Sequence, residues 1–351
     1  MTLAAFLRHL GFAIGLVVLS AAIVRVMIAV RVMDTPEARK AHTRPTPKGG
    51  GVAVVLTFLV GIAVLYRYAA FARLADPYFL GVIEASVAIA VVAFLDDLFD
   101  WPFTVKLTAQ LLASLIAVAS GLYVASINVP TIGGVQLGWI GAVATVFWVL
   151  FTTNAVNFID GLNGLASGVS LIACLFLAFI AEQQGGWFGY AASGLLAAGL
   201  LGFLPFNFPR ARIFLGDVGS QFCGFMLAVL ALVASRFEGV ELSALLMPML
   251  LSGVLFDVAL TLARRARDGE RITQAHRGHL YQVAHRSGVS PVRITLVHWG
   301  FATWGGLCCL LFIAAPPTAK PLVPLLTLAP QAAWLRFVVR RAQAAGLRRW
   351  G

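Results

Sequence analysis

The sequence predicts an all-α polytopic membrane protein. Sixty per cent of its 351 residues are hydrophobic and only 12% are charged, whereas about 25% of the residues in a typical soluble protein are charged. The apolar residues also gather in long runs, and a helix needs about 20 of them to cross the hydrocarbon core of a bilayer. These two observations exclude an arrangement of one or two soluble domains.

The runs predict about eleven transmembrane helices within a single integral-membrane domain, residues 1–351. The expected ranges are 10–30, 50–68, 77–95, 105–125, 138–156, 163–182, 188–206, 217–235, 243–263, 292–314 and 321–340. The first run is too long for the apolar region of a signal peptide and contains Arg25, so it is expected to remain as a helix.

The distribution of lysine and arginine predicts the orientation of the chain. Twenty of the 26 basic residues fall in one set of alternate connecting segments, and five fall in the other set. The basic set comprises 31–49, 96–106, 154–162, 207–216, 264–293 and the tail from 336. Because basic loops stay in the cytoplasm, we expect the N-terminus outside and the C-terminus in the cytoplasm. The net charge of +11 therefore indicates contact with membrane lipids rather than with nucleic acid.

Three aspartates lie where the third predicted span ends, in the segment AFLDDLFD, residues 93–100. A buried ionised carboxylate costs several kcal/mol unless it is paired, so adjacent Asp96 and Asp97 indicate a site for a proton or for Mg²⁺, which prefers oxygen ligands. A solvated helix end is the alternative. Lys106 and Gln110 follow on one face of the fourth span.

Polar residues recur at every third position after the fifth span, at Asn154, Asn157, Asp160 and Asn163. In a helix this spacing places them in one narrow stripe, and the two glycines of the same segment let a ligand approach the backbone. An ordinary polar loop would not need such regular spacing. The pattern favours a site for a nucleotide and a metal ion.

The segment NFPRARIFLGDVGS, residues 207–220, leads into the eighth span. Asp217 and Ser220 have the side chains that cap a helix N-terminus, which is the simpler interpretation. The same N-terminus would also bind phosphate, and Asp217 would hold a metal ion beside it. We favour the functional interpretation, because the other carboxylates are predicted on the same face.

The last predicted cytoplasmic loop, 264–293, contains seven arginines, and the positive-inside rule alone explains most of them. It also contains the motif HRGHLYQ, in which His276, Arg277 and His279 are suited to contact a pyrophosphate. A zinc site would need a further nitrogen or sulfur ligand, and only His285 is near.

Two other features are weaker. Lys48 lies in the stiff basic segment PTPKGGG, residues 45–51, which could cradle phosphate but lacks the P-loop pattern. Asp257 lies inside the ninth predicted span, where an ionisable residue usually has a function. It is also two turns from Arg264, so a position near the membrane interface is the alternative.

In this order, the motifs resemble those of one family, the polyprenyl-phosphate N-acetylhexosamine-1-phosphate transferases (glycosyltransferase family 4). The matching stretches are PTPKGGG, LDDLFD with Lys106 and Gln110, NAVNFIDGLNGLA, FLGDVGS and HRGHLYQ, and they run from His42 to Gln282. The family includes the peptidoglycan translocase I enzymes and the initiators of O-antigen and enterobacterial common antigen.

The resemblance implies transfer of an N-acetylhexosamine 1-phosphate from a UDP-sugar to undecaprenyl phosphate, with release of UMP. It also implies a Mg²⁺ cofactor, with Mn²⁺ as an alternative ion, and an active site at the cytoplasmic face of the bacterial inner membrane. The implied roles are catalytic for Asp96, Asp97, Asp160, His276 and His279, substrate-binding for Lys48, Lys106, Asn154, Asn163, Asn207 and Arg277, and metal-binding for Asp217 and Asn157.

Two departures from the motifs of the peptidoglycan translocases narrow the choice of donor sugar. Peptidoglycan translocases resemble DGLDG with a run of histidines, whereas this chain has DGLNG, with Asn163, and HRGHLYQ. These differences argue against a muramoyl-pentapeptide donor and favour the O-antigen branch, with a UDP-N-acetylfucosamine-like donor ahead of UDP-N-acetylglucosamine. The sequence does not decide the oligomeric state, and a homodimer is one alternative.

An ion-coupled membrane transporter is the alternative class of function. Transporters place ionisable residues near the middle of the membrane and often contain inverted repeats. Here the acidic residues are predicted at one interface and the sequence shows no clear repeat. The enzyme is therefore the favoured interpretation.

Overall fold

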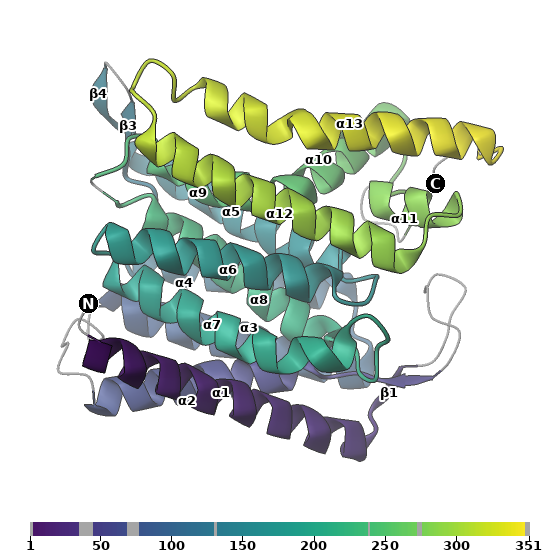
Figure 1. The fold of residues 1–351 in the computed structure, drawn as a ribbon, viewed down its shortest axis with the longest axis horizontal. Coiled ribbons are helices and arrows are strands. Elements are labelled where there is room, and N and C mark those ends of the chain that lie inside the picture. The colour runs from purple at the N-terminus through teal and green to yellow at the C-terminus, as the bar shows by residue number, and fades with distance from the viewer. Residues whose placement is uncertain are drawn as a thin grey trace.

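A computed structural model describes residues 3–34, 45–68, 77–129, 132–237, 239–271 and 276–347 of the chain. Long helices lie side by side in a bundle, and two short antiparallel hairpins, β1–β2 and β3–β4, lie at its ends (Figure 1). The elements are α1 (Leu3–Val30), β1 (Met33–Asp34), β2 (Thr46–Pro47), α2 (Gly51–Tyr68), α3 (Pro77–Phe99), α4 (Phe103–Ala119), β3 (Ser126–Val129), β4 (Gly133–Gln136), α5 (Gly138–Phe158), α6 (Leu165–Gln183), α7 (Trp187–Asn207), α8 (Gly216–Ala234), the 3₁₀ turn η2 (Ser243–Leu245), α9 (Leu246–Leu250), α10 (Ser252–Arg267), α11 (Leu280–Arg286), α12 (Pro291–Ala314) and α13 (Leu322–Ala344).

Nine helices in the described ranges are long and apolar enough to cross a membrane, and a tenth span results if the bent pair α9–α10 is counted as one. The prediction of an all-α polytopic membrane protein is confirmed. The eleven spans and the orientation stay predictions.

Two predicted spans differ from the helices observed. The span expected over 105–125 is the shorter helix α4, which ends at Ala119 just before Gly121, whose φ of +84° favours glycine and stops the helix. The span expected over 243–263 is broken, and its two parts are bent by 79°. Pro248 lies just before the break and lacks the N–H that a continuous helix would use.

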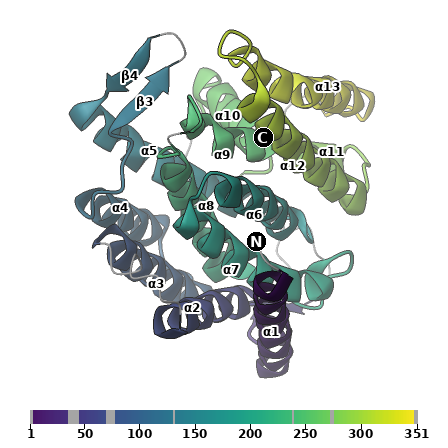
Figure 2. The ribbon, with the colours of Figure 1, turned by 60° about the vertical axis from the view of Figure 1, so that its left-hand side comes forward.

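Helix α8 lies in the middle of the bundle (Figure 2), packed against α2, α3 and α5. In the most apolar 18-residue window of this helix, 89% of the residues are buried. Burial of a helix on all sides needs apolar residues all round it, and the run FCGFMLAVLALVA supplies them. The first turn of α8, with Asp217, is thereby surrounded by the ends of three other helices.

The segment PTPKGGG is docked on the start of α8. The N–H groups of Gly50 and Gly51 donate to the carbonyls of Phe214 and Leu215 at 2.9 and 2.8 Å. A Cβ on Gly51 would lie only 2.2 Å from Cα of Gly219, so only glycine permits this approach. The contact fixes the position of Lys48 beside the site. His42, which belongs to the stretch that carries the resemblance, lies outside the described residues.

Candidate active site

A cavity of about 1120 Å³ brings together every residue that the sequence predicts for the site. Its wall includes parts of α3, α4, α5, α8, α10 and α11. The predicted residues on this wall are Lys48, Asp96, Asp97, Lys106, Asn154, Asn157, Asp160, Asn163, Asn207, Asp217, His276, Arg277 and His279. Their convergence is observed, whereas the chemical role of each residue stays a prediction.

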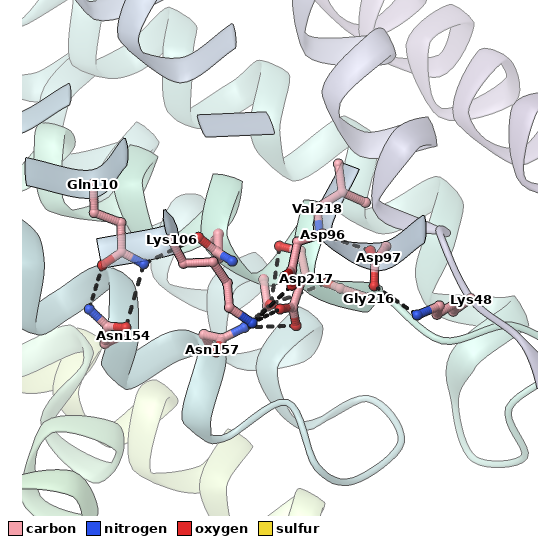
Figure 3. Close-up of polar contacts among 12 residues, drawn as sticks. Lys48, Asp96, Asp97, Lys106, Gln110, Asn154, Asn157, Gly216, Asp217 and Val218 are labelled. Carbon is pink, nitrogen blue, oxygen red and sulfur yellow. Dashed lines mark hydrogen bonds and ion pairs between the residues drawn. The ribbon is translucent and has the colours of Figure 1, made fainter. Parts of the chain in front are cut away.

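Lys106 joins two carboxylates that come from different helices (Figure 3). Its Nζ donates to Oδ2 of Asp96 at 2.8 Å and to Oδ2 of Asp217 at 2.9 Å. Asp96 is 5% exposed, and its Oδ1 has no hydrogen-bond partner in the part of the chain that the structure describes. A buried carboxylate oxygen without a partner is costly, so this atom is placed to accept a cation or a proton.

Asp97 has different partners from its neighbour. Its Oδ2 accepts the backbone N–H of Val218 at 3.2 Å, and its Oδ1 lies 3.5 Å from Nζ of Lys48. The side chain therefore lies at the N-terminus of α8, where the helix dipole stabilises a negative charge. Asp100, which follows the end of α3, is exposed. The two adjacent aspartates therefore serve different parts of the cavity.

Asn157 and Asp217 form the third side of this ionic cluster. Nδ2 of Asn157 donates to Oδ1 of Asp217 at 3.2 Å and to Oγ of Ser220 at 2.8 Å. Neither Asp217 nor Ser220 caps α8, because its N-cap residue is Leu215, which makes no side-chain hydrogen bond. The simpler interpretation of this segment is therefore wrong for Asp217, whose carboxylate points to Lys106 and Asn157 instead.

A layer of buried amides lies one helical turn from the ionic cluster, on the same three helices. Nδ2 of Asn154 donates to Oε1 of Gln110 at 2.6 Å, and Nε2 of Gln110 donates to Oε1 of Gln221 at 3.2 Å. Sequence reasoning missed Gln221, although it follows Asp217 by four residues and so shares its helix face. The amides hold α4, α5 and α8 in register under the charged groups, and any contact of Asn154 with substrate stays a prediction.

The DGLNG loop is held by the segment that precedes α8. Oδ1 of Asn207 accepts the N–H of Gly164 at 2.7 Å, and Nδ2 donates to the carbonyl of Ile213 at 2.9 Å. Nδ2 of Asn163 donates to the carbonyl of Pro209 at 3.2 Å. These contacts support a positioning role for Asn207, and its contact with substrate stays a prediction.

Asp160 begins the DGLNG loop and lies between the membrane-spanning helices α5 and α6. Burial, together with the negative charges of Asp217 and Asp97, raises the pKa of this carboxyl well above its usual value. Asp160 therefore holds a proton more readily than a solvated carboxyl does. A carboxyl with so strongly perturbed a pKa is typical of a functional site.

The HRGHLYQ motif covers the cavity from the α10–α11 side. The rings of His276 and His279 are 4.9 Å apart, and the hydroxyl of Tyr281 donates to the carbonyl of Phe158 at 2.9 Å. Burial and nearby positive charges lower the pKa of His276 to about 4. Arg264 donates to the carbonyl of Gly278, so this arginine also supports the motif.

One side of the cavity is apolar, and sequence reasoning did not identify it. The wall includes Phe147, Leu150 and Phe151 of α5 together with Val258 and Leu262 of α10. Phe147 is 67% exposed, so this side of the cavity extends to the outer surface of the bundle. The cavity thus combines a charged floor with an apolar flank.

The residues present fit a single Mg²⁺ ion. Asp217 offers carboxylate oxygens, and Oδ1 of Asp96, which has no partner among the described residues, belongs to the same lysine-linked pair. Asn157 turns its amide nitrogen to Asp217, so its oxygen would coordinate the ion after the amide rotates. In the described ranges no three His, Cys, Asp or Glu side chains form a metal-binding group. Mg²⁺ commonly uses one or two carboxylates and completes its shell with substrate phosphates and water.

Comparisons with known proteins agree with this chemistry. Residues 79–235 match the sequence profile of glycosyl transferase family 4. The probable undecaprenyl-phosphate N-acetylglucosaminyl 1-phosphate transferase of Bacillus subtilis (strain 168) is 30% identical over 275 residues, which cover 78% of this chain and 75% of the relative. The decaprenyl-phosphate N-acetylglucosaminephosphotransferase of Mycobacterium tuberculosis (strain ATCC 25618 / H37Rv) is 31% identical over 306 residues, or 79% and 75% of the two chains.

A third relative extends the match over more of the chain. The phospho-N-acetylmuramoyl-pentapeptide-transferase of Acetivibrio thermocellus is 30% identical over 338 residues, which cover 88% of this chain and 94% of the relative. All three relatives are named as transferases, which favours a phosphotransferase over an ion-coupled transporter. The resemblance carried by the motifs is confirmed, and the chain belongs to glycosyl transferase family 4, the polyprenyl-phosphate N-acetylhexosamine-1-phosphate transferases.

Proposed function

We propose that this protein transfers an N-acetylhexosamine 1-phosphate from a UDP-sugar to undecaprenyl phosphate and releases UMP, at the cytoplasmic face of a bacterial inner membrane. The observation that carries the proposal is that paired lysines and aspartates, the HRGHLYQ motif and an apolar flank all line the same cavity. Such a cavity suits one anionic substrate from water and one from the membrane.

The chemistry requires two anions to approach each other. An oxygen of the lipid phosphate attacks the sugar-linked phosphorus of the donor, and the bond from that phosphorus to the oxygen of UMP breaks. UMP leaves with the electron pair of this bond. Because such a transfer demands little covalent help from the protein, positioning and charge neutralisation contribute most of the catalysis.

Lys106 and Lys48 supply positive charge within the cavity. Lys106 lies between Asp96 and Asp217 and can turn toward an incoming phosphate without leaving the cluster. Asp97, held by the start of α8, is placed to take the proton from the lipid phosphate. A Mg²⁺ ion held by Asp217 and Asn157 would supply further charge neutralisation to the donor diphosphate, with Mn²⁺ as an alternative ion.

The apolar flank supports a lipid acceptor. The wall formed by Phe147, Phe151 and Leu262 offers hydrocarbon contacts to a polyprenyl chain, each buried CH₂ contributing about 0.8 kcal/mol. The charged floor at its end would then receive the phosphate of the same molecule. A soluble nucleotide sugar needs no such flank.

The donor side is proposed to lie between the DGLNG loop and the HRGHLYQ motif. Asn163 and Arg277 line the cavity on these two sides. We propose an O-antigen-type pathway, with a UDP-N-acetylfucosamine-like donor ahead of UDP-N-acetylglucosamine. The support is the pair of departures from the peptidoglycan translocases at Asn163 and in HRGHLYQ.

Asp217→Asn tests the proposed metal site. The variant should lose turnover, measured as UMP release at saturating Mg²⁺, by at least about 10³-fold, because a missing ligand removes charge stabilisation worth several kcal/mol. Its thermal unfolding in detergent should stay close to wild type. Asp268→Asn, at the exposed end of α10, is the matched control. Turnover near wild type in Asp217→Asn would exclude this residue from the metal site.

A further inference from the structure

We propose that Asp257 is a positioning residue that fixes the ring of His279 toward the cavity. The inference rests on the proposed function in one respect, which is that His279 then acts on the donor diphosphate. Sequence reasoning left Asp257 between a functional role and a position near the membrane interface. The contacts of its carboxylate decide between these alternatives.

The Asp257 carboxylate is almost completely used within the protein. It lies on α10 with 1% exposure, where Oδ1 accepts the N–H of Leu280 at 2.8 Å and Oδ2 accepts the N–H of Tyr281 at 3.0 Å. The hydroxyl of Thr261 donates to Oδ1 at 3.2 Å. An unpaired buried carboxylate would cost several kcal/mol, and these donors offset that cost at the start of α11.

The same carboxylate also contacts His279, the residue that immediately precedes α11. Nδ1 of His279 lies 3.2 Å from Oδ1 of Asp257, and the histidine is 3% exposed. An ionised carboxylate can only accept, so Nδ1 carries the hydrogen. This fixes the tautomer of the ring and leaves Nε2 as the nitrogen available to the cavity that His279 lines.

Aromatic neighbours hold the plane of the ring. Tyr281 stacks on His279 with an interplanar angle of 20° and a centroid separation of 6.0 Å, and Phe158 lies at 5.8 Å on α5. The backbone N–H of His279 also donates to Oε1 of Gln282 at 3.3 Å. With the backbone, the plane and Nδ1 all constrained, the direction of Nε2 is set by Asp257.

Asp257 lies beyond the bend in the ninth predicted span. Asp257 belongs to the half of the broken span that turns by 79° from the preceding half. Its carboxylate ties α10 to the start of α11, beside the cavity that His279 lines.

A ligand-free measurement tests the position directly. In protein labelled with ¹⁵N-histidine, the resonances absent from His279→Ala identify this ring, and they should show a protonated Nδ1 in wild type. Asp257→Asn should change this pattern, since an amide facing two backbone N–H groups cannot keep all the contacts of the carboxylate. The same pattern in both proteins would overturn the inference.

A double-mutant cycle tests the consequence for turnover. Asp257→Asn should lower kcat by about 10²-fold, the scale expected when a catalytic group is displaced by about 1 Å. In the His279→Ala background it should cost less than about twofold, because the group that it positions is gone. A purely structural role would give the same cost in both backgrounds, and that result would overturn the inference.

Two further variants keep the test decisive. Asp257→Glu keeps the charge and serves if Asp257→Asn does not fold, with an intermediate loss of kcat expected. Glu270→Gln removes the partner of Arg265 on the same helix and should leave turnover unchanged. If wild type turns over no UDP-sugar, the proposed function fails, and the ¹⁵N pattern still decides the position of His279.

Discussion

Asp97 and Asp100 lie three residues apart at the end of α3, and only Asp97 is held by other elements. Its carboxylate contacts Lys48 and the N–H of Val218, whereas Asp100 is exposed. Asp97→Asn should therefore lose at least about 10²-fold in turnover, the usual scale for a positioned proton acceptor. Asp100→Asn should lose much less. Equal losses of UMP release in the two variants would contradict the assignment of a catalytic role to Asp97 and not to Asp100.

His276 makes stability depend on pH. Burial, with the positive charges of Arg264 and Arg265 nearby, lowers the pKa of His276 to about 4 in the folded protein, against about 6.5 in an unfolded chain. Between these two pKa values, His276 binds more protons in the unfolded chain than in the folded protein. Its contribution to folding stability is therefore complete above pH 6.5 and is lost as the pH falls toward 4.

His276→Asn should remove this pH dependence. Between pH 7 and pH 5, the Tm of the variant in detergent should fall less than the Tm of wild type. The comparison isolates the effect of the His276 imidazole on stability. Asp160, whose raised pKa makes stability change with pH in the opposite direction, is present in both proteins. A difference between the two proteins that stays constant over this range would contradict the assignment.

The residues of the site could be predicted from the sequence because each lies in a short polar segment at the end of an apolar run. Lys106, Asn157 and Asp217 were recognised in this way, and they lie together. Their pairing could not be predicted, since it depends on which helices pack against α8. Gln221 was missed because it lies just beyond the polar segment that ends at Ser220, and Asp257 was left open because it lies within α10, away from the polar helix ends.

At the scale of elements, α2 and α8 meet backbone to backbone. A Cβ on Gly51 would lie 2.2 Å from Cα of Gly219, so Gly51→Ala should push the two helix starts apart and shift Asp217. Overpacking of this kind costs about 1–3 kcal/mol. We expect a lower Tm and reduced UMP release.

Gly15→Ala in α1 is the matched control for that substitution. A Cβ at Gly15 would have no neighbour within 4 Å, and alanine is the better helix former by about 1 kcal/mol. Its Tm and turnover should equal or exceed those of wild type. If both glycine variants behaved alike, the docking of PTPKGGG on α8 would not position the site.

The lengths and order of most helices could be predicted because apolar length alone limits a membrane span. The bend between α9 and α10 could not, since a count of apolar residues does not register a 79° change of direction. The β3–β4 hairpin was also missed. Its strands have only four residues each, too short for alternation of polar and apolar residues to stand out beside long apolar runs.

At the scale of the whole molecule, the bundle places a charged floor and an apolar flank around one cavity. The floor depends on α3, α4, α5 and α8, and the flank on α5 and α10. Helix α5 contributes to both, so a lipid lying along the flank would end at the ionic cluster. This arrangement is the physical basis for proposing a reaction between a membrane lipid and a soluble nucleotide sugar.

The central claim is tested most directly by incubating purified, folded protein with Mg²⁺, undecaprenyl phosphate and a panel of UDP-sugars, and by measuring UMP release. UMP should appear with a UDP-N-acetylhexosamine, in amounts equal to the lipid diphosphate sugar formed, and only when the lipid phosphate is present. Release of no UMP from any donor by protein with an intact thermal unfolding transition would contradict the proposed function.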